Sequence, residues 1–135
     1  VHSGYGWVWL DQNGNQRMLG LHNQPRRLSS LHTEMEALLW AMQCALQYST
    51  TQAFGTDCQD VIKMIEKPEE WPKFSTELKE FNRLRRNFST FSITYVPRSL
   101  VSNADHLAKL ARSYVSSLSY VGCSIPVWVT TPPQV

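Results

Sequence analysis

The sequence predicts an α/β domain with a small mixed sheet flanked by helices. Three observations support this: an aromatic-rich hairpin opens the chain, two later apolar runs are too short for helices, and segments with helical spacing surround those runs. The 135 residues, 42% hydrophobic and 18% charged, suit one compact core and exclude disorder. No apolar run approaches the roughly 18 residues needed to cross a bilayer, so we expect no membrane partner.

The first element is a β-hairpin. Residues 5–10, Tyr-Gly-Trp-Val-Trp-Leu, alternate in the manner of a strand rich in aromatic residues. The pair Asn13-Gly14 is a strong signal for a hairpin turn. Residues 16–22 are therefore expected to return antiparallel to the first strand.

Four segments carry apolar residues at the spacing of an amphipathic helix. They cover residues 31–46, 58–66, 71–88 and 103–118. Capping residues are expected at three of their starts: Ser30 or Thr33, then Asp57, then Asn103. Pro68 is expected to end the second helix.

The remaining strands are short. Residues 53–56 are bounded by polar residues, and residues 91–96 alternate, with Phe91, Ile93 and Tyr95 on one side, until Pro97 stops the strand. With the hairpin, these runs predict a sheet of four strands. We assign residues 1–118 to the domain and residues 119–135 to a tail, which is expected to be extended at residues 125–133 because of its prolines.

Charge and cysteine content restrict the setting only loosely. The net charge is +2, but residues 73–98 are locally basic. The three cysteines share no C-x-x-C spacing, which argues against a zinc site or a disulfide framework. Unpaired cysteines are typical of a reducing compartment, so we expect an intracellular protein, nuclear or cytoplasmic.

Three acidic residues, Glu36, Asp57 and Asp105, are expected near the ends of their elements. Carboxylates gathered at one edge of an α/β sheet repel one another unless a cation neutralises them, and Mg²⁺ or Mn²⁺ is the natural partner. Taken singly, each residue is better explained as a helix cap or as a charge that stabilises the helix dipole than as a metal ligand. Spacing alone does not choose between Glu36 and the nearby Glu34.

The sequence motifs around these carboxylates resemble those of the ribonuclease H family, and the resemblance covers nearly the whole chain. Residues 3–7, Ser-Gly-Tyr-Gly-Trp, look like the Gly-rich entry to that family's second strand. Residues 34–38, Glu-Met-Glu-Ala-Leu, resemble the motif of the family's catalytic helix, which selects Glu36 as the catalytic carboxylate. Residues 56–59, Thr-Asp-Cys-Gln, resemble the motif at the end of a strand, which selects Asp57. Residues 103–108, Asn-Ala-Asp-His-Leu-Ala, resemble the closing motif, which selects Asp105.

A finer resemblance is to the C-terminal, archaeal-type ribonuclease H domain of plant LINE-type (non-LTR) retrotransposon reverse transcriptases. It rests on two motifs, Tyr-Val-Pro-Arg at residues 95–98 and Cys-Ser-Ile-Pro-Val-Trp at residues 123–128. In that subgroup an arginine seven residues before the last Asp replaces the histidine of the bacterial enzyme, and Arg98 stands at that distance from Asp105. The resemblance thus implies an upstream reverse transcriptase domain as a partner.

The resemblance implies an endonuclease that hydrolyses the RNA strand of RNA·DNA hybrids with two Mg²⁺ ions, Mn²⁺ being a substitute. Glu36 and Asp57 would hold mainly the leaving-group side and Asp105 the water side. Arg98 would attend the scissile phosphate or help the product to leave.

The resemblance also implies residues that contact the hybrid. His32, Thr33 and Gln59 match positions that reach its minor groove, although exposure at a helix start explains them equally well. The cluster Arg83, Arg85 and Arg86 could hold phosphates of the DNA strand, but a solvated helix end also accounts for it.

One part of the family pattern lies outside this sequence. The family's first catalytic Asp stands on a central strand some ten residues before the Gly-Tyr-Gly segment, and only Val1, His2 and Ser3 precede Gly4. We expect either an upstream strand that carries this Asp or a substitute strand formed by residues 125–130. The alternative function is a catalytically impaired, ribonuclease H-like module that binds nucleic acid by shape.

Overall fold

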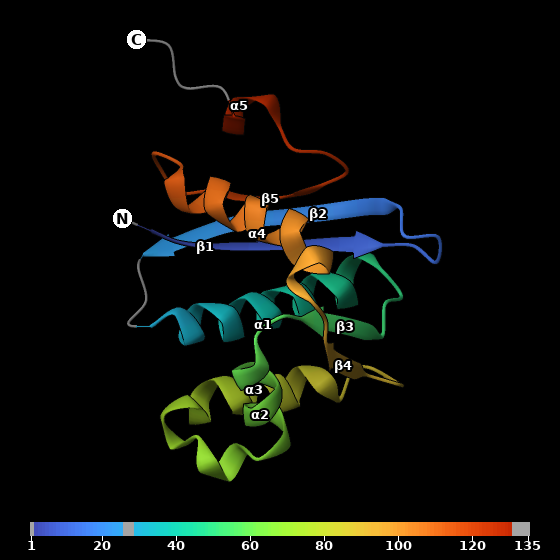
Figure 1. The fold of residues 1–135 in the computed structure, drawn as a ribbon, viewed down its shortest axis with the longest axis vertical. Helices are drawn as coiled ribbons and strands as arrows, with labels where there is room; N and C mark the ends of the chain where they lie inside the picture. The colour runs from blue at the N-terminus through green and yellow to red at the C-terminus, as the bar shows by residue number, and fades with distance from the viewer. Residues whose placement is uncertain (1, 26–28, 131–135) are drawn as a thin grey trace. The chain divides into compact units, whose positions relative to one another are not determined.

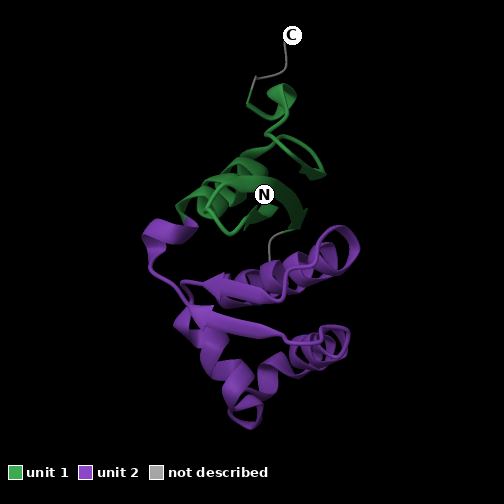
Figure 2. Ribbon diagram, turned by 90° about the vertical axis from the view of Figure 1, so that its right-hand side faces the viewer, with its two compact units in different colours: residues 1–28, 102–135 green, residues 29–101 purple. Residues whose placement is uncertain are grey.

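The computed structural model describes residues 2–25 and 29–130. The chain forms two compact units, residues 1–28 with 102–135 (unit 1) and residues 29–101 (unit 2), coloured separately in Figure 2. The strands are β1 (His2–Leu10), β2 (Gln16–Pro25), β3 (Ala53–Thr56), β4 (Ser92–Tyr95) and β5 (Ser119–Gly122) (Figure 1). The helices are α1 (Ser30–Tyr48), α2 (Gln59–Glu66), α3 (Ser75–Arg85), α4 (Arg98–Ser113) and α5 (Val127–Thr130), with short 3₁₀ turns η1 (Pro68–Glu70) and η2 (Pro72–Phe74). Within the described residues, no helix is both long and apolar enough to span a membrane.

Unit 1 contains the predicted hairpin, which is confirmed. β1 and β2 pair antiparallel, with a register irregularity at Trp9 and Leu10. The turn is closed by Asp11, whose Oδ1 accepts hydrogen bonds from the backbone N–H groups of Asn13 and Asn15, both at 2.9 Å. Gly14 has a φ of 80°, a left-handed conformation that glycine adopts without strain.

Helix α4 packs against β1 at unusually close range because β1 carries glycines. A Cβ atom on Gly4 would lie 1.9 Å from the carbonyl oxygen of Ala108, and one on Gly6 would lie 2.4 Å from that of Ala104. The core beside this contact consists of Leu19, Leu21, Leu107, Ala111 and Leu118. The Gly-x-Gly motif therefore sets the distance between β1 and α4.

Asn23 is a buried polar residue that ties β2 to the last turn of α4 and to the segment after it. Its Nδ2 donates to the carbonyl oxygens of Ala111 and Ser116, both at 2.9 Å. Its Oδ1 accepts from the N–H of Leu118 at 2.9 Å. The side chain thus uses three of its hydrogen-bonding positions inside the protein.

We expect Asn23→Ala to lower the free energy of unfolding by about 2 to 3 kcal/mol, because it leaves buried backbone groups without partners. Urea denaturation of both proteins measures the change. Gln24→Ala is the matched control, because Gln24 is exposed, and it should change stability by less than about 0.5 kcal/mol. Equal effects of the two substitutions would contradict the assigned role of Asn23.

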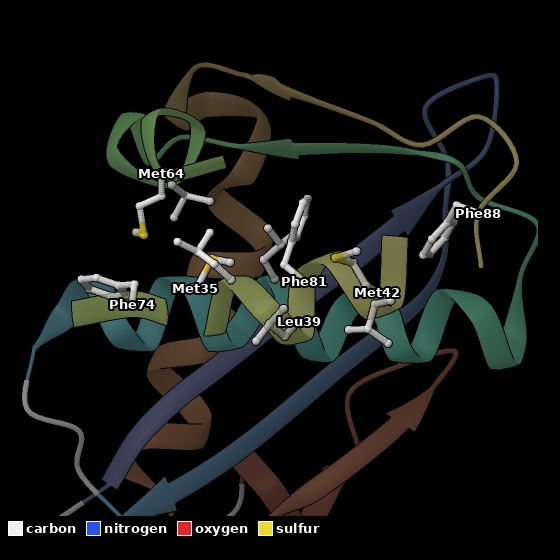
Figure 3. Packing of buried hydrophobic residues seen from close by; sticks show 11 residues of the cluster. Met35, Leu39, Met42, Met64, Phe74, Phe81 and Phe88 are labelled. Atoms are coloured by element: carbon white, nitrogen blue, oxygen red, sulfur yellow. The ribbon is translucent and has the colours of Figure 1, made fainter. Parts of the chain in front are cut away.

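Unit 2 is built on two parallel strands, β3 and β4, paired from Ala53↔Ser92 to Thr56↔Tyr95. Its core joins α1, α2, α3 and both strands, with Phe81 among its most buried side chains. Figure 3 shows Phe74 and Phe88 at opposite ends of this cluster, with Met35, Leu39 and Phe81 between them. This core holds β3 and β4 in place, and candidate site residues follow both strands.

The expected helix caps are wrong in detail. The N-cap of α1 is Ser29, whose Oγ accepts from the N–H of His32 at 3.2 Å, so neither Ser30 nor Thr33 serves. The N-cap of α2 is Cys58 and not Asp57. Asn103 lies inside α4, because Pro97 allows the helix to start earlier, at Arg98.

The helix expected at 71–88 is shorter, because Pro72 opens the 3₁₀ turn η2 and α3 spans only Ser75–Arg85. The apolar spacing continues through η2 since a 3₁₀ turn also brings residues three apart together. Pro68 indeed follows the end of α2.

The tail also differs from expectation. Residues 119–122 form β5, and Val127–Thr130 are helical, because Pro126 is compatible with a first helical turn. Residues 131–133 of the expected extended tail lie outside the described residues.

The described strands form two sheets rather than one sheet of four strands. One has the order β1-β2-β5 and the other is the pair β3-β4. The proposed substitute strand at residues 125–130 is wrong, because the tail strand is β5 and it pairs with β2. Within the described residues, β1 pairs only with β2, and β3 only with β4.

Candidate nuclease site

Asp57 lies directly after β3, between that strand and α2. The Thr56 Oγ1 atom accepts a hydrogen bond from the N–H of Cys58 at 3.1 Å. The capping interpretation of Asp57 is therefore wrong, because Thr56 binds the N–H at this turn. The Asp57 side chain is only 16% exposed.

Arg98 is the partner of Asp57. Its Nε lies 3.2 Å from Asp57 Oδ2, although the two residues are 41 positions apart. The parallel ladder brings them together, because the Val96 N–H donates to the Thr56 carbonyl at 2.9 Å, one residue before Asp57 and two before Arg98. Two residues that the sequence predicts for the site, one cationic and one acidic, therefore lie side by side.

Glu36 and Glu34 lie on α1 on either side of Met35, which is fully buried. Residues two positions apart in an α-helix are about 200° apart around its axis, so the two carboxylates point in different directions. Burial raises the pKa of the Cys58 thiol, and the negative charge of Glu34 raises it further. Glu34 thus acts on the residue that follows Asp57.

Asp105 belongs to unit 1 and lies inside α4, not in the first helical turn as expected. It is half-buried. The preceding residue, Ala104, has the carbonyl oxygen that faces Gly6. The close contact between β1 and α4 therefore fixes the backbone beside Asp105.

A metal centre at Glu36, Asp57 and Asp105 stays a prediction. Among residues 2–25 and 29–130, no three or more histidine, cysteine or acidic side chains are grouped closely enough to hold a metal ion. The donor chemistry is nevertheless suitable, since all three side chains offer carboxylate oxygens, which Mg²⁺ prefers. Asp57 already has a cationic group beside it.

Two of the predicted hybrid contacts belong to the first turn of α1. His32 Nδ1 bonds to Ser29 Oγ at 2.7 Å, and its ring stacks on Phe74 with centroids 4.2 Å apart. Thr33 Oγ1 donates to the Ser29 carbonyl at 3.4 Å. Gln59 is exposed at the start of α2. The structure gives His32 and Thr33 local structural roles that sequence reasoning missed.

The arginine cluster lies at the C-terminal end of α3, but its members differ. Arg83 forms an ion pair with Glu80, which lowers the pKa of that carboxyl. Arg85 lies over the ring of Phe91, with its Cζ 5.8 Å from the centroid. Arg86 is exposed, and neither of these contacts involves it. Arg86 is accordingly the member best placed to bind a phosphate.

Tyr95 is the last of the alternating residues Phe91, Ile93 and Tyr95. It is 51% exposed at the end of β4, opposite Thr56 in the register. The alternation of Phe91, Ile93 and Tyr95 is a correct strand signal, but burial stops before the last member. An exposed aromatic ring therefore lies on the strand that leads to Arg98.

The comparisons with known proteins concern the family and the fold. Residues 1–111 match a family described as reverse transcriptase-like. The chain belongs to this reverse transcriptase-like family. A solved structure of RNase H1 from the halophilic archaeon Halobacterium salinarum NRC-1 is similar, with 26% identity and a TM-score of 0.71 over 82% of this chain and 85% of that one. The chain therefore has the RNase H fold, which confirms the fold class predicted from the sequence.

A second structure, the protease-reverse transcriptase of prototype foamy virus, aligns at 14% identity and a TM-score of 0.48. The alignment covers 86% of this chain and 21% of the viral one. No curated protein matches the chain.

Proposed function

We propose that this reverse transcriptase-like chain is a ribonuclease H-type endonuclease domain that hydrolyses the RNA strand of RNA·DNA hybrids. The observation that carries the proposal is the pair Asp57–Arg98, formed where β3 and β4 end. The Asp57 carboxylate and the Arg98 guanidinium thus lie side by side in an RNase H fold, and in this proposal Arg98 would bind a phosphate of the substrate. The similarity to an archaeal RNase H1 supports the same reaction class.

Glu36, Asp57 and Asp105 would hold the metal ions in this proposal. Bound Mg²⁺ would supply an activated water and stabilise the leaving oxygen of the phosphodiester. The chain's own part is to hold carboxylate oxygens on rigid elements and to offer the Arg98 guanidinium to a phosphate. Asp57 and Asp105 are each half-buried, which limits the movement of each side chain within its own unit.

The test is cleavage of an end-labelled RNA·DNA hybrid in Mg²⁺ or Mn²⁺, beside RNA·RNA and DNA·DNA duplexes. The proposal expects cleavage of the RNA strand of the hybrid alone, with 5′-phosphate and 3′-hydroxyl products. If the hybrid binds but is never cut in either metal, the chain is instead a nucleic-acid-binding module.

An upstream extension of the protein is part of this test. The resemblance implies a further strand that ends in a catalytic Asp, and β1 and β3 each pair on one side only within the described residues. We expect the extended protein to cleave faster than residues 1–135. Equal rates would show that no upstream Asp takes part.

The finer context is also a proposal. The reverse transcriptase-like family match and the words at 95–98 and 123–128 support a domain that works beside a reverse transcriptase in a LINE-type retrotransposon of a plant. Hybrids made by such an enzyme lie inside the cell, in the nucleus or cytoplasm. Co-purification of this chain with an upstream reverse transcriptase segment tests the partnership.

The arginine cluster leads to a graded prediction for hybrid binding. Arg86→Ala should make the dependence of log affinity on log salt shallower by about 0.9, the value of one lost phosphate contact. Arg83→Ala should change the slope by less, because Glu80 already holds Arg83. Binding assays over a range of salt concentrations measure both slopes. An unchanged slope for Arg86→Ala would leave the cluster as a solvated helix end.

A further inference from the structure

The ion pair at the ends of β3 and β4 is asymmetric in a way that bears on metal binding. The Asp57 side chain is 16% exposed, whereas the Arg98 side chain is 82% exposed. Asp57 follows a strand and is enclosed, while Arg98 extends into solvent from the start of α4. Of the two partners, Arg98 is therefore the one that can leave.

The contact joins Arg98 Nε to Asp57 Oδ2 at 3.2 Å. Because the Arg98 side chain is mostly in solvent, water competes for its guanidinium, and ion pairs of exposed groups contribute little. The backbone on both sides of Arg98 is held, because the Val96 N–H donates to the Thr56 carbonyl and the Leu100 N–H donates to the Pro97 carbonyl, both at 2.9 Å. With this flanking backbone held, the exposed guanidinium can exchange partners without a change of fold.

We propose that Arg98 is a displaceable counter-ion of Asp57 that couples metal binding to phosphate binding; this rests on the proposed function. Without metal, Arg98 neutralises Asp57. Because a divalent cation and a guanidinium compete for the same carboxylate oxygen and repel each other, Arg98 leaves when Asp57 takes a metal ion. The planar guanidinium then binds a phosphate of the nucleic acid.

This exchange makes the two ligands cooperative. Metal binding alone must break the Asp57–Arg98 pair, and so must phosphate binding to Arg98 alone. When both ligands bind, the pair is broken only once. By linkage, each ligand raises the affinity for the other by the same factor.

The experiment measures Mg²⁺ affinity by isothermal titration calorimetry on the full chain, without nucleic acid. Arg98→Ala should bind Mg²⁺ about two- to fivefold more tightly than the wild type, the range expected for the loss of one exposed pair. Lys63→Ala is the matched control, because Lys63 is an exposed cation of the same unit whose ion pair is with Asp60. It removes the same charge without touching Asp57.

The second measurement is hybrid affinity with and without Mg²⁺, using a 2′-O-methyl RNA strand that cannot be cut. The increase in affinity caused by Mg²⁺ should be smaller for Arg98→Ala than for the wild type. Arg98→Lys keeps a charge but lacks the planar fork, so its increase should be intermediate.

The outcomes separate this inference from the proposed function. If Arg98→Ala leaves Mg²⁺ affinity unchanged, or Lys63→Ala raises it equally, the displacement is refuted while the metal site stands. If Asp57→Asn binds Mg²⁺ as the wild type does, or the wild type binds none, the metal site itself is refuted.

Discussion

Asp57→Asn should reduce cleavage of an RNA·DNA hybrid by about 10²- to 10³-fold or more, the scale of losing one preorganised electrostatic group. The substitution keeps the shape of the side chain but removes the charge that holds a cation. Because Thr56, and not Asp57, bonds to the N–H of Cys58, the fold should be retained. Initial rates under single-turnover conditions, with circular dichroism to verify folding, give the measurement.

Asp60→Asn is the matched control for this variant. Asp60 lies in the first turn of α2, is exposed, and forms its ion pair with Lys63. Its cleavage rate should stay within about twofold of the wild type, because exposed pairs contribute little. If Asp57→Asn and Asp60→Asn behaved alike, Asp57 would not be a catalytic carboxylate.

A second pair of variants decides which of the two glutamates of α1 is the metal ligand. Because the family motif selects Glu36, Glu36→Gln should reduce the cleavage rate about as much as Asp57→Asn does. Glu34→Gln should not reduce it. The reverse result would assign the metal ligand to Glu34, whose charge already acts on Cys58.

Gly6→Ala should lower the free energy of unfolding by about 3 kcal/mol, at the upper end of the overpacking range. Its Cβ would lie 2.4 Å from the Ala104 carbonyl and 2.7 Å from the Ala108 nitrogen, both backbone atoms that cannot move aside without shifting α4. Such a shift would also displace Asp105, which follows Ala104. Both the free energy of unfolding, measured by urea denaturation, and the rate of hybrid cleavage should therefore fall.

Gly122→Ala provides a comparison within unit 1. A Cβ there would meet first the hydroxyl end of the Tyr120 side chain and not a backbone atom. The expected loss is below about 1 kcal/mol, typical of a substitution that the structure can accommodate. A small loss for Gly6→Ala would contradict the close packing of α4 on β1.

The sequence predicted the types of most elements because their signals are local. The Asn13-Gly14 turn, the alternation in residues 5–10 and the apolar stripe of α1 each depend on neighbouring residues alone. Element ends were less well predicted, because several residues can cap a helix. Ser29, Ser30 and Thr33 all have suitable hydroxyls, and only the backbone geometry identifies Ser29.

The pairing of Asp57 with Arg98 shows what local patterns omit. The family resemblance implied separate roles for the two residues. Their contact depends on the parallel register of β3 and β4, which joins distant segments. The family words identified both residues as candidates without showing that one holds the other. Likewise, nothing local indicates that His32 stacks on Phe74.

The central claim is that Glu36, Asp57 and Asp105 share metal ions, and Mn²⁺ in a crystal tests it most directly. An anomalous difference map collected from a Mn²⁺-soaked crystal should show a peak bound by carboxylate oxygens of all three residues, at about the 2.0 to 2.2 Å typical of hard divalent cations. Its intensity should fall strongly in Asp57→Asn. A peak elsewhere on the chain, or carboxylates more than about 10 Å apart, beyond shared coordination, would contradict the assignment of a nuclease centre.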